Sequence, residues 1–329
     1  MSQKLLNVDA LQVQFETQKG KLICVEDVSF SIDHGETVAL VGESGCGKSV
    51  TSLSIMHLLA DNGSICGGTV TFDGMDITHA PESLMHELRG AKMSMIFQEP
   101  MTSLNPLLKI DYQIMEVLKL HTKNSKKENR KKALELLKEV GIPNPEKAMK
   151  SYPHELSGGM RQRVMIAIAL ACSPELLIAD EPTTALDVTI QAQILNLIRE
   201  LRSKHNAAVL LITHDLGVVA EMADSVVVMY CGQVVERAPV FELFQNYKHP
   251  YTKGLLAAVP TLDLQEGETI KPIPGTVPGL NEIDPKACRF KNRCPYASER
   301  CGREAPDMVE VAPGHYVRCF GPEGGNFNG

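Results

Sequence analysis

The chain has 329 residues, of which 43% are hydrophobic, and its formal net charge is −7. This length is enough for one large domain with an appendage, and the hydrophobic share fits a globular protein with a sizeable core. The acidic balance argues against a nucleic-acid partner, because domains that bind nucleic acid are usually basic. We find no signal peptide, and the most apolar run, residues 164–172, is less than half the length that spans a bilayer. We therefore expect a cytosolic chain that reaches a membrane only through a partner.

Alternating apolar residues at 5–15 and 20–32 predict two strands of an antiparallel sheet at the start of the chain. Phe15 lies near the end of the first strand. Its ring could stack on a nucleotide base, or it could equally pack in the core.

A glycine-rich segment connects a predicted strand at residues 37–41 to a predicted helix. The segment satisfies G-x-x-x-x-G-K-[ST] in the context that this nucleotide-binding pattern requires, with a strand before it and a helix after it. Backbone N–H groups and the helix N-terminus can surround a phosphate chain, Lys48 adds a charge, and the Ser49 hydroxyl suits Mg²⁺. A glycine turn without a ligand explains the glycines but not Lys48 and Ser49. The predicted nucleotide-binding residues are Gly42, Glu43, Ser44, Gly45, Cys46, Gly47, Lys48, Ser49 and Val50.

Two short strands are predicted next, at residues 69–72 and 94–97, and the second ends at Gln98. Gln98 has both a donor and an acceptor, so it could contact Mg²⁺ and an attacking water. From residue 102 to residue 153, leucines at helical spacing and a group of lysines and arginines predict a helical insertion with a basic surface. Such a surface could meet anionic lipid, but it is more often simply solvated.

A second glycine turn, at Ser157, Gly158 and Gly159, lies directly before a helix predicted at residues 161–172. It offers backbone N–H donors and a helix N-terminus, which could hold the nucleotide of another subunit. The alternative is an ordinary helix whose N-terminus is capped by serine.

Three further apolar runs, at residues 175–180, 207–212 and 225–230, alternate with predicted helices at 190–204 and 215–222. This alternation predicts a parallel sheet with helices packed on it and with ligands at the carboxyl ends of its strands.

Acidic residues and a histidine end two of these strands. Neighbouring strand side chains point in opposite directions, so Asp180 could approach Mg²⁺ through a water while Glu181 faces the attacking water as general base. Alternatively, the two acids mark a helix start. His214 could donate a hydrogen bond to a γ-phosphate oxygen, or it could be a core histidine.

Proline and glycine become frequent after about residue 250, which indicates a linker into a small C-terminal module. Of the nine cysteines, five are scattered and have the character of ordinary reduced residues. The other four are Cys288, Cys294, Cys301 and Cys319. Four thiolates in so small a module suggest a metal staple. Zinc usually prefers closely spaced cysteine pairs, which are absent, and iron–sulfur clusters also take four cysteines, while free thiols or adventitious disulfides stay possible.

Six motifs together resemble the ATPase subunits of ABC transporters over residues 5–250: the phosphate loop, Gln98, residues 156–159, Asp180-Glu181, Ala185-Leu186-Asp187 and His214. Met160 departs from the family, which usually has glutamine there. The resemblance implies an α/β fold: a P-loop ABC ATPase core whose mixed sheet has a RecA-like parallel part and an antiparallel lead-in sheet. It implies an ATPase domain at residues 1–250 with a helical subdomain at about 100–160, followed by a Cys-rich C-terminal extension at 251–329.

The resemblance also implies a head-to-tail dimer that holds two ATP molecules between the phosphate loop of one subunit and the 157–159 turn of the other. Glu181 would be the base and His214 would contact the γ-phosphate. Asp187 would lie across the dimer seam and Phe15 would stack on adenine. The residues around ATP·Mg²⁺ would be Lys48, Ser49, Gln98 and Asp180.

Within that family the chain is most similar to the ATP-binding subunits of bacterial dipeptide and oligopeptide importers, through residues 97–106, 249–252, 273–280 and 288–295. This similarity implies peptide uptake, a paralogous ATPase subunit or a second copy, two transmembrane permease subunits and an extracytoplasmic solute-binding protein. It places the chain at the cytoplasmic face of the inner membrane and implies a 4Fe–4S cluster at the four terminal cysteines. Nickel or another small solute is the alternative cargo, and a soluble non-transport ABC ATPase or an exporter motor are the alternative functions.

Overall fold

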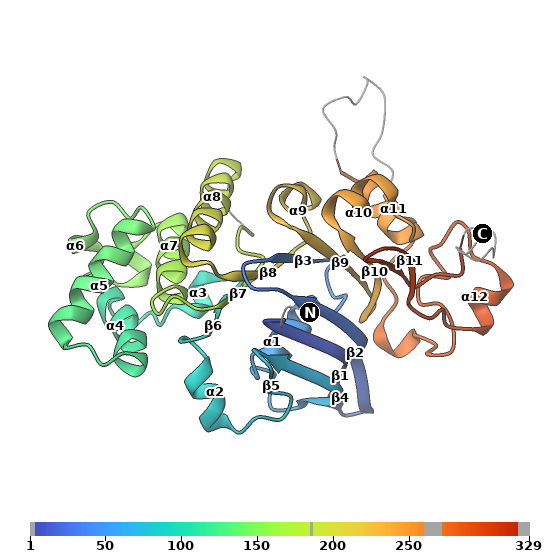
Figure 1. Cartoon of the computed structure of the whole chain (residues 1–329), viewed down its shortest axis with the longest axis horizontal. Coiled ribbons are helices and arrows are strands. Elements are labelled where there is room, and N and C mark those ends of the chain that lie inside the picture. The colour runs from blue at the N-terminus through green and yellow to red at the C-terminus, as the bar shows by residue number, and fades with distance from the viewer. Residues whose placement is uncertain (1–3, 185–186, 260–271, 322–329) are drawn as a thin grey trace, which may run out of the picture. The chain divides into compact units, whose positions relative to one another are not determined.

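The computed structural model describes residues 4–184, 187–259 and 272–321 (Figure 1). Its contacts divide the chain into two compact units, and each is described by itself. We call residues 1–5, 32–36 and 80–212 the helical unit, and residues 6–31, 37–79 and 213–329 the loop unit.

An antiparallel sheet opens the loop unit, in the order β2-β1-β4-β5 (Figure 1). Its strands are β1 (Leu6–Thr17), β2 (Gly20–Ile32), β4 (Gly63–Phe72) and β5 (Met75–Asp76). β1 and β4 run antiparallel from the pair Leu6 and Phe72 to the pair Phe15 and Gly63. The predicted lead-in sheet is therefore confirmed, and the strand expected at 69–72 is the end of a longer one.

The loop unit also contains a group of strands around the phosphate loop. β3 (Thr37–Val41) runs parallel to β9 (Ser225–Tyr230), and every residue of β3 is buried. β10 (Gln233–Pro239) is antiparallel to β9. The helices of this part are α1 (Lys48–Ile55), α9 (Leu216–Met222), α10 (Val240–Asn246) and α11 (Pro250–Ala257).

The C-terminal segment adds to this group of strands. β12 (His315–Val317) pairs with β10, and β11 (Val309–Ala312) pairs with β12, both antiparallel. Short helices η2 (Leu280–Glu282) and α12 (Glu299–Arg303) precede them. Phe290 lies in the same hydrophobic core as Tyr230 and Tyr251, so the described part of this segment packs onto the rest of the loop unit.

The helical unit contains three parallel strands, β6 (Met93–Ile96), β7 (Leu176–Asp180) and β8 (Ala208–Thr213). All residues of these strands are buried, as expected for continuous apolar runs in a parallel sheet. The predicted helical insertion is confirmed and lies at one end of this unit (green, Figure 1). The helices of the unit are α2 (Glu82–Leu88), α3 (Pro100–Ser103), α4 (Ile110–His121), α5 (Lys126–Glu139), α6 (Pro145–Ala148), η1 (Pro153–Glu155), α7 (Gly158–Ala169) and α8 (Val188–His205).

Side-chain caps account for the helix boundaries that differ from prediction. The helix expected at 161–172 is α7, which begins at Gly158 because the Ser157 hydroxyl caps it. The helix expected at 190–204 begins at Val188, where the Asp187 carboxylate is the cap. Among the described residues, no helix is both long and apolar enough to cross a membrane.

Candidate functional site

The phosphate loop joins β3 to α1 and depends on glycine geometry. Gly42 has a φ of 152°, and a Cβ added there would lie 2.2 Å from the carbonyl oxygen of Met229. Gly47, the N-cap of α1, has a φ of 103°. A side chain at either position would be strained, so the loop can take this path only with glycine. Ser44, Gly45 and Ser49 are exposed, which leaves the tip of the loop open to a ligand.

Lys48 places its charge inside the loop. The residue is only 5% exposed, and its Nζ donates to the carbonyl oxygens of Gly42 at 2.8 Å and Glu43 at 3.2 Å. Nζ also lies 3.9 Å from the Sγ of Cys46, and burial raises the pKa of that thiol. Cys46 therefore stays a neutral packing residue. The ammonium and the start of α1 give this loop the positive charge that suits an anion.

The loop is braced by its own unit. The N–H of Cys46 donates to the carbonyl of Glu43 at 3.2 Å, and the N–H of Gly232 donates to the carbonyl of Cys46 at 2.9 Å. The N–H of Glu43 donates to the hydroxyl of Tyr251 at 2.8 Å. These bonds hold the loop in place without using the groups at its tip.

In the helical unit, Gln98 and Glu181 meet at the ends of β6 and β7. Nε2 of Gln98 donates to Oε2 of Glu181 at 3.1 Å, and the Thr184 hydroxyl donates to the same oxygen at 2.9 Å. Asp180 precedes them at the end of β7 and is 5% exposed. Two predicted catalytic side chains are therefore in contact, together with Thr184, which the sequence reasoning missed.

Glu181 is held in an unusual backbone conformation. Its φ is 45°, in the left-handed region that residues other than glycine seldom adopt, and its N–H donates to the carbonyl of Ile212 at 2.9 Å. Such strain persists only when surrounding contacts fix it, and it clusters at functional sites. The helix-start alternative for Asp180 and Glu181 is wrong, because Asp180 ends β7 and α8 begins only at Val188.

The second glycine turn is open on its outer side. Ser157 is exposed, and its hydroxyl accepts from the N–H of Met160 at 3.3 Å, so the capping interpretation is confirmed. A Cβ added to Gly158 would meet nothing within 4 Å. Capping leaves the turn exposed, so both interpretations of it are compatible.

Three other predicted site residues lie at strand and helix ends. His214 is exposed directly after β8, so the core-histidine alternative is wrong. Phe15 is half-buried, and its ring packs over Gly63, where an added Cβ would lie 2.8 Å from Cε1. Asp187 is exposed, and its carboxylate accepts from the N–H of Ile190 at 3.0 Å. Ala185 and Leu186, from the same predicted motif, lie outside the described residues.

The four terminal cysteines line one small cavity of about 10 Å³ in the loop unit, which is roughly the room that one water needs. Burial raises the pKa of Cys288 to about 12 and that of Cys319 to about 11, and the nearby cysteines add to both shifts. Among the described residues, no group of three or more histidines, cysteines or acids is arranged to hold a metal ion. This arrangement by itself therefore supports neither the predicted cluster nor the zinc alternative at these cysteines.

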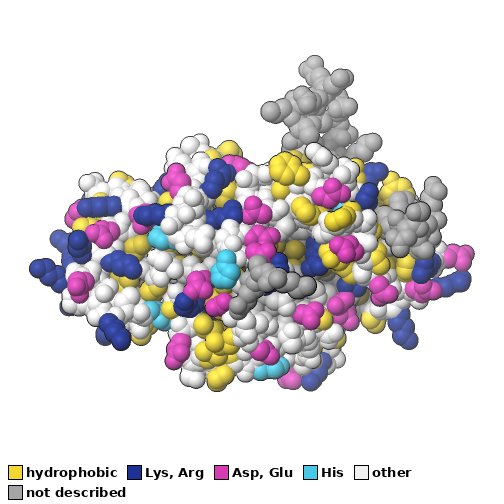
Figure 2. Space-filling view, in the orientation of Figure 1, with side chains coloured by type: hydrophobic (Ala, Val, Ile, Leu, Met, Phe, Trp, Pro, Cys, Tyr) yellow, Lys and Arg dark blue, Asp and Glu magenta, His cyan; other side chains and the backbone are white. Residues whose placement is uncertain are grey.

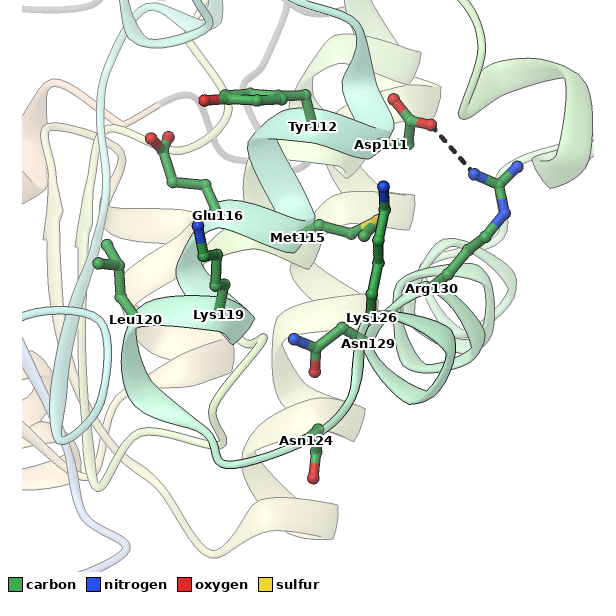
Figure 3. Close-up of a pocket in the computed structure, with 10 residues that line it drawn as sticks. All are labelled: Asp111, Tyr112, Met115, Glu116, Lys119, Leu120, Asn124, Lys126, Asn129 and Arg130. Atoms are coloured by element: carbon green, nitrogen blue, oxygen red, sulfur yellow. Dashed lines mark hydrogen bonds and ion pairs between the residues drawn. The ribbon is translucent and has the colours of Figure 1, made fainter.

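A larger cavity, of about 680 Å³, lies between α4 and α5 in the helical unit (Figure 3). An ion pair of 3.4 Å joins Arg130 and Asp111 at its edge, and its lining mixes acidic, basic and apolar side chains. It has no glycine turn, and its three basic and two acidic side chains leave a net charge of only +1.

The basic surface of the insertion is exposed. Lysines 123, 126, 127 and 131 and Arg130 are exposed. Figure 2 shows basic side chains at this end of the molecule interspersed with acidic ones.

Comparisons with known proteins agree with these features. Residues 25–184 match the family described as ABC transporter, and residues 235–301 match the oligopeptide/dipeptide transporter C-terminal region. The chain is 54% identical over 317 residues to the oligopeptide transport ATP-binding protein AppD of Bacillus subtilis, with 96% of each chain covered. It is 49% identical over 318 residues to the dipeptide transport ATP-binding protein DppD of Escherichia coli, with 97% of each covered.

Solved structures give the same fold. The dimeric post-hydrolysis state of the ATP-binding cassette MJ0796, bound to ADP and Pi, matches with a TM-score of 0.65 and 27% identity. That match covers 71% of this chain and 98% of the cassette. The chain therefore belongs to the ATP-binding subunits of ABC transporters, in the group that carries the oligopeptide/dipeptide transporter C-terminal region.

Proposed function

We propose that this chain is the ATP-hydrolysing motor of an importer for dipeptides or oligopeptides. The observation that carries the proposal is the phosphate loop, in which Lys48 is buried against the loop's own carbonyls, α1 begins and the tip is exposed. Relatives that match over nearly their whole length are oligopeptide and dipeptide transport proteins, which supports this class of cargo. The alternative cargo is nickel or another small solute.

The catalytic proposal assigns Glu181 as general base toward the water that attacks the γ-phosphate. Gln98 and Thr184 both donate to one carboxylate oxygen of Glu181, which orients the carboxylate for this role. Lys48 and His214 would contact the γ-phosphate. Mg²⁺, which neutralises phosphate charge, would be held by Ser49, Gln98 and Asp180.

The subunit arrangement that we propose is a head-to-tail dimer, with a paralogous ATPase or with a second copy. The turn supports it, because Ser157 is exposed and the space beside Gly158 is open, which suits the nucleotide of a facing subunit. Asp187, also exposed, would lie at the seam, and Phe15 would stack on adenine.

The remaining partners follow from peptide import. We propose two transmembrane permease subunits, an extracytoplasmic solute-binding protein and a position on the cytoplasmic face of the membrane. In this proposal residues 1–250 form the ATPase domain, with the helical subdomain at about 100–160, and residues 251–329 form the extension.

The experiment that tests this function is affinity capture of the tagged chain from detergent-solubilised membranes, followed by reconstitution of what co-purifies. We expect two hydrophobic permease subunits and ATP-dependent uptake of labelled di- or tripeptides into vesicles. Capture of no membrane subunit would favour a soluble ABC ATPase. Uptake of nickel in place of peptide would favour the alternative cargo, and outward transport would favour an exporter.

We also propose that Cys288, Cys294, Cys301 and Cys319 hold a structural 4Fe–4S cluster. The support is that all four line one cavity and that Cys319 accepts a 3.4 Å hydrogen bond from the N–H of Gly321, as cluster thiolates commonly do. The narrow cavity would have to widen on loading. Anaerobically purified protein should show visible absorption and acid-labile sulfide, and the lack of both would refute the cluster.

A further inference from the structure

A short loop of the C-terminal segment contacts the phosphate loop. We call residues 288–294 the arginine loop. Nη1 of Arg293 donates to Oε2 of Glu43 at 2.6 Å, and Nη2 donates to Oε1 at 2.9 Å. Glu43 is the second residue of the phosphate loop. The two partners of this bidentate ion pair are 250 positions apart in the sequence. Both residues belong to the loop unit.

Arg293 is fixed from several sides. Its side chain is 4% exposed, and its Nε donates to the carbonyl of Pro274 at 2.9 Å. Its guanidinium carbon lies 5.7 Å from the ring centroid of Tyr230. A guanidinium is charged at any physiological pH, so this contact joins two full charges. The ion pair is therefore a rigid, permanently charged contact rather than a loose surface bridge.

A second contact, through Tyr251, holds the backbone of Glu43. Tyr251, which accepts the N–H of Glu43, is fully buried and packs against Phe290 with ring centroids 5.4 Å apart. Phe290 is itself part of the arginine loop. The arginine loop thus contacts the Glu43 carboxylate directly, and it reaches the Glu43 amide only through the packing of Phe290 on Tyr251.

Arg289 makes a second connection. Its guanidinium donates to the carbonyl of Cys231 and to the carboxylate of Glu26. The next residue, Gly232, donates its N–H to the carbonyl of Cys46 in the phosphate loop. Arg293 therefore contacts the phosphate loop directly, whereas Arg289 is connected to it only through Cys231 and Gly232.

A carboxylate in a triphosphate-binding loop is electrostatically unfavourable, because like charges at short range repel strongly where water is partly excluded. A bidentate contact with an arginine neutralises this charge and fixes the carboxylate in one orientation. We propose that Arg293 is a positioning residue for nucleotide binding, so that the C-terminal segment sets the ATP affinity of the phosphate loop by neutralising Glu43. This inference rests on the proposed function of that loop as the ATP site.

The test is an equilibrium titration of the full chain with a fluorescent ATP analogue and Mg²⁺. We expect Arg293→Met to weaken binding on the order of tenfold, because it leaves the Glu43 charge uncompensated beside the phosphates. Glu43→Gln alone should bind more tightly than the parent chain, because Arg293 then adds an unshared positive charge. The double variant should recover most of the affinity lost in Arg293→Met.

That recovery separates charge compensation from a merely structural role. If Arg293 only supports the fold, the double variant will bind as weakly as Arg293→Met or more weakly, and the proposal is overturned. Arg293→Lys keeps the charge but not the two-pronged geometry, so it should lie between the parent and Arg293→Met. It also keeps the proposal testable if Arg293→Met fails to fold.

Two controls complete the design. Arg303→Met removes the same charge from the same segment, but its pair with Glu299 is 77% and 86% exposed, so it should change affinity less than about twofold. Lys48→Ala should lose binding in the same assay. Normal binding by Lys48→Ala would refute the ATP-site assignment itself, whereas loss in Lys48→Ala with normal binding in Arg293→Met would overturn only this inference.

Discussion

The phosphate loop and the Glu181 site are built in different ways. The loop is defined by backbone geometry, with glycines at φ values that side chains resist and with a lysine folded onto the loop's own carbonyls. The Glu181 site is defined by side chains, because Gln98 and Thr184 converge on one carboxylate oxygen of a strained residue. The phosphate loop is thus specified by a local sequence pattern and braced by distant residues, whereas the Glu181 site needs Gln98, from a segment 83 positions away, to assemble its side chains. Binding and hydrolysis should therefore be separable by mutation.

The largest expected effect is on hydrolysis at the Glu181 site. Glu181→Gln should lower kcat by a factor of about 100 to 10,000, because the amide cannot accept the proton of the attacking water. ATP binding should persist, since the phosphate loop is unchanged, and the closed dimer should accumulate. Single-turnover hydrolysis and size-exclusion chromatography with ATP measure the two effects. Unimpaired turnover would mean that another group is the base.

The second-largest expected effect is on ATP binding at the phosphate loop. Lys48→Ala removes a buried ammonium and should weaken ATP binding by about two orders of magnitude, as expected for charge-assisted contacts to phosphate. Equilibrium nucleotide titration checks this, with circular dichroism to confirm that the fold is kept. Unchanged affinity would show that the loop is not the nucleotide site.

A smaller effect on kcat is expected from removing the Thr184 hydroxyl, and it tests the role of that residue. Thr184→Val removes one of the two donors that orient Glu181 and should lower kcat several-fold while ATP affinity stays the same. Thr183→Val, one residue earlier, is the matched control and should leave kcat unchanged. Equal loss in both variants would mean that the segment tolerates no change, and that the hydrogen bond to Glu181 is not the cause.

The sequence predicts much of the loop side and less of the Glu181 side. The strands at 37–41 and 225–230 have the predicted bounds, because continuous apolar runs flanked by polar residues allow few alternatives. Helix starts were misplaced where capping at Ser157 and Asp187 extends α7 and α8 toward their N-termini. The contact of Thr184 with Glu181 has only a weak signal, a hydroxyl three residues after an acid.

Contacts over a long sequence separation had no signal at all. The pair of Arg293 with Glu43 and the pair of His315 with Glu236 each need the fold before their partners can be named. Periodicity and motif spacing describe local structure, so they carry no information about which distant side chain will meet a given carboxylate.

The smallest expected effect is a pH dependence of stability from His315. Burial by itself lowers the pKa of His315, but its hydrogen bonds to Glu236 and Glu242 outweigh this and raise the pKa above the ordinary value. Protonated His315 therefore stabilises the folded state. This stabilisation is complete below the pKa that His315 has in the unfolded chain, and it is lost as the pH rises through the higher pKa of the folded state. His315→Gln should therefore cost more stability at pH 6 than at pH 9, with a difference of about 1 kcal/mol.

His249 also lies near Glu236, but its effect on the pH dependence of stability has the opposite sign. Burial lowers its pKa to about 4, so its neutral form is required and stability falls as pH drops below the unfolded-state value. Comparing His315→Gln with the parent chain at each pH cancels this contribution. Urea unfolding at the two pH values measures the difference, and an equal cost at both would contradict a charged His315.

The most direct test of the central claim is a structure of the Glu181→Gln variant with ATP and Mg²⁺. The account predicts the γ-phosphate within hydrogen-bond distance of the Lys48 ammonium in one subunit and of the Ser157 turn of a facing subunit. A γ-phosphate far from Lys48, or a Ser157 turn that faces no nucleotide, would contradict it.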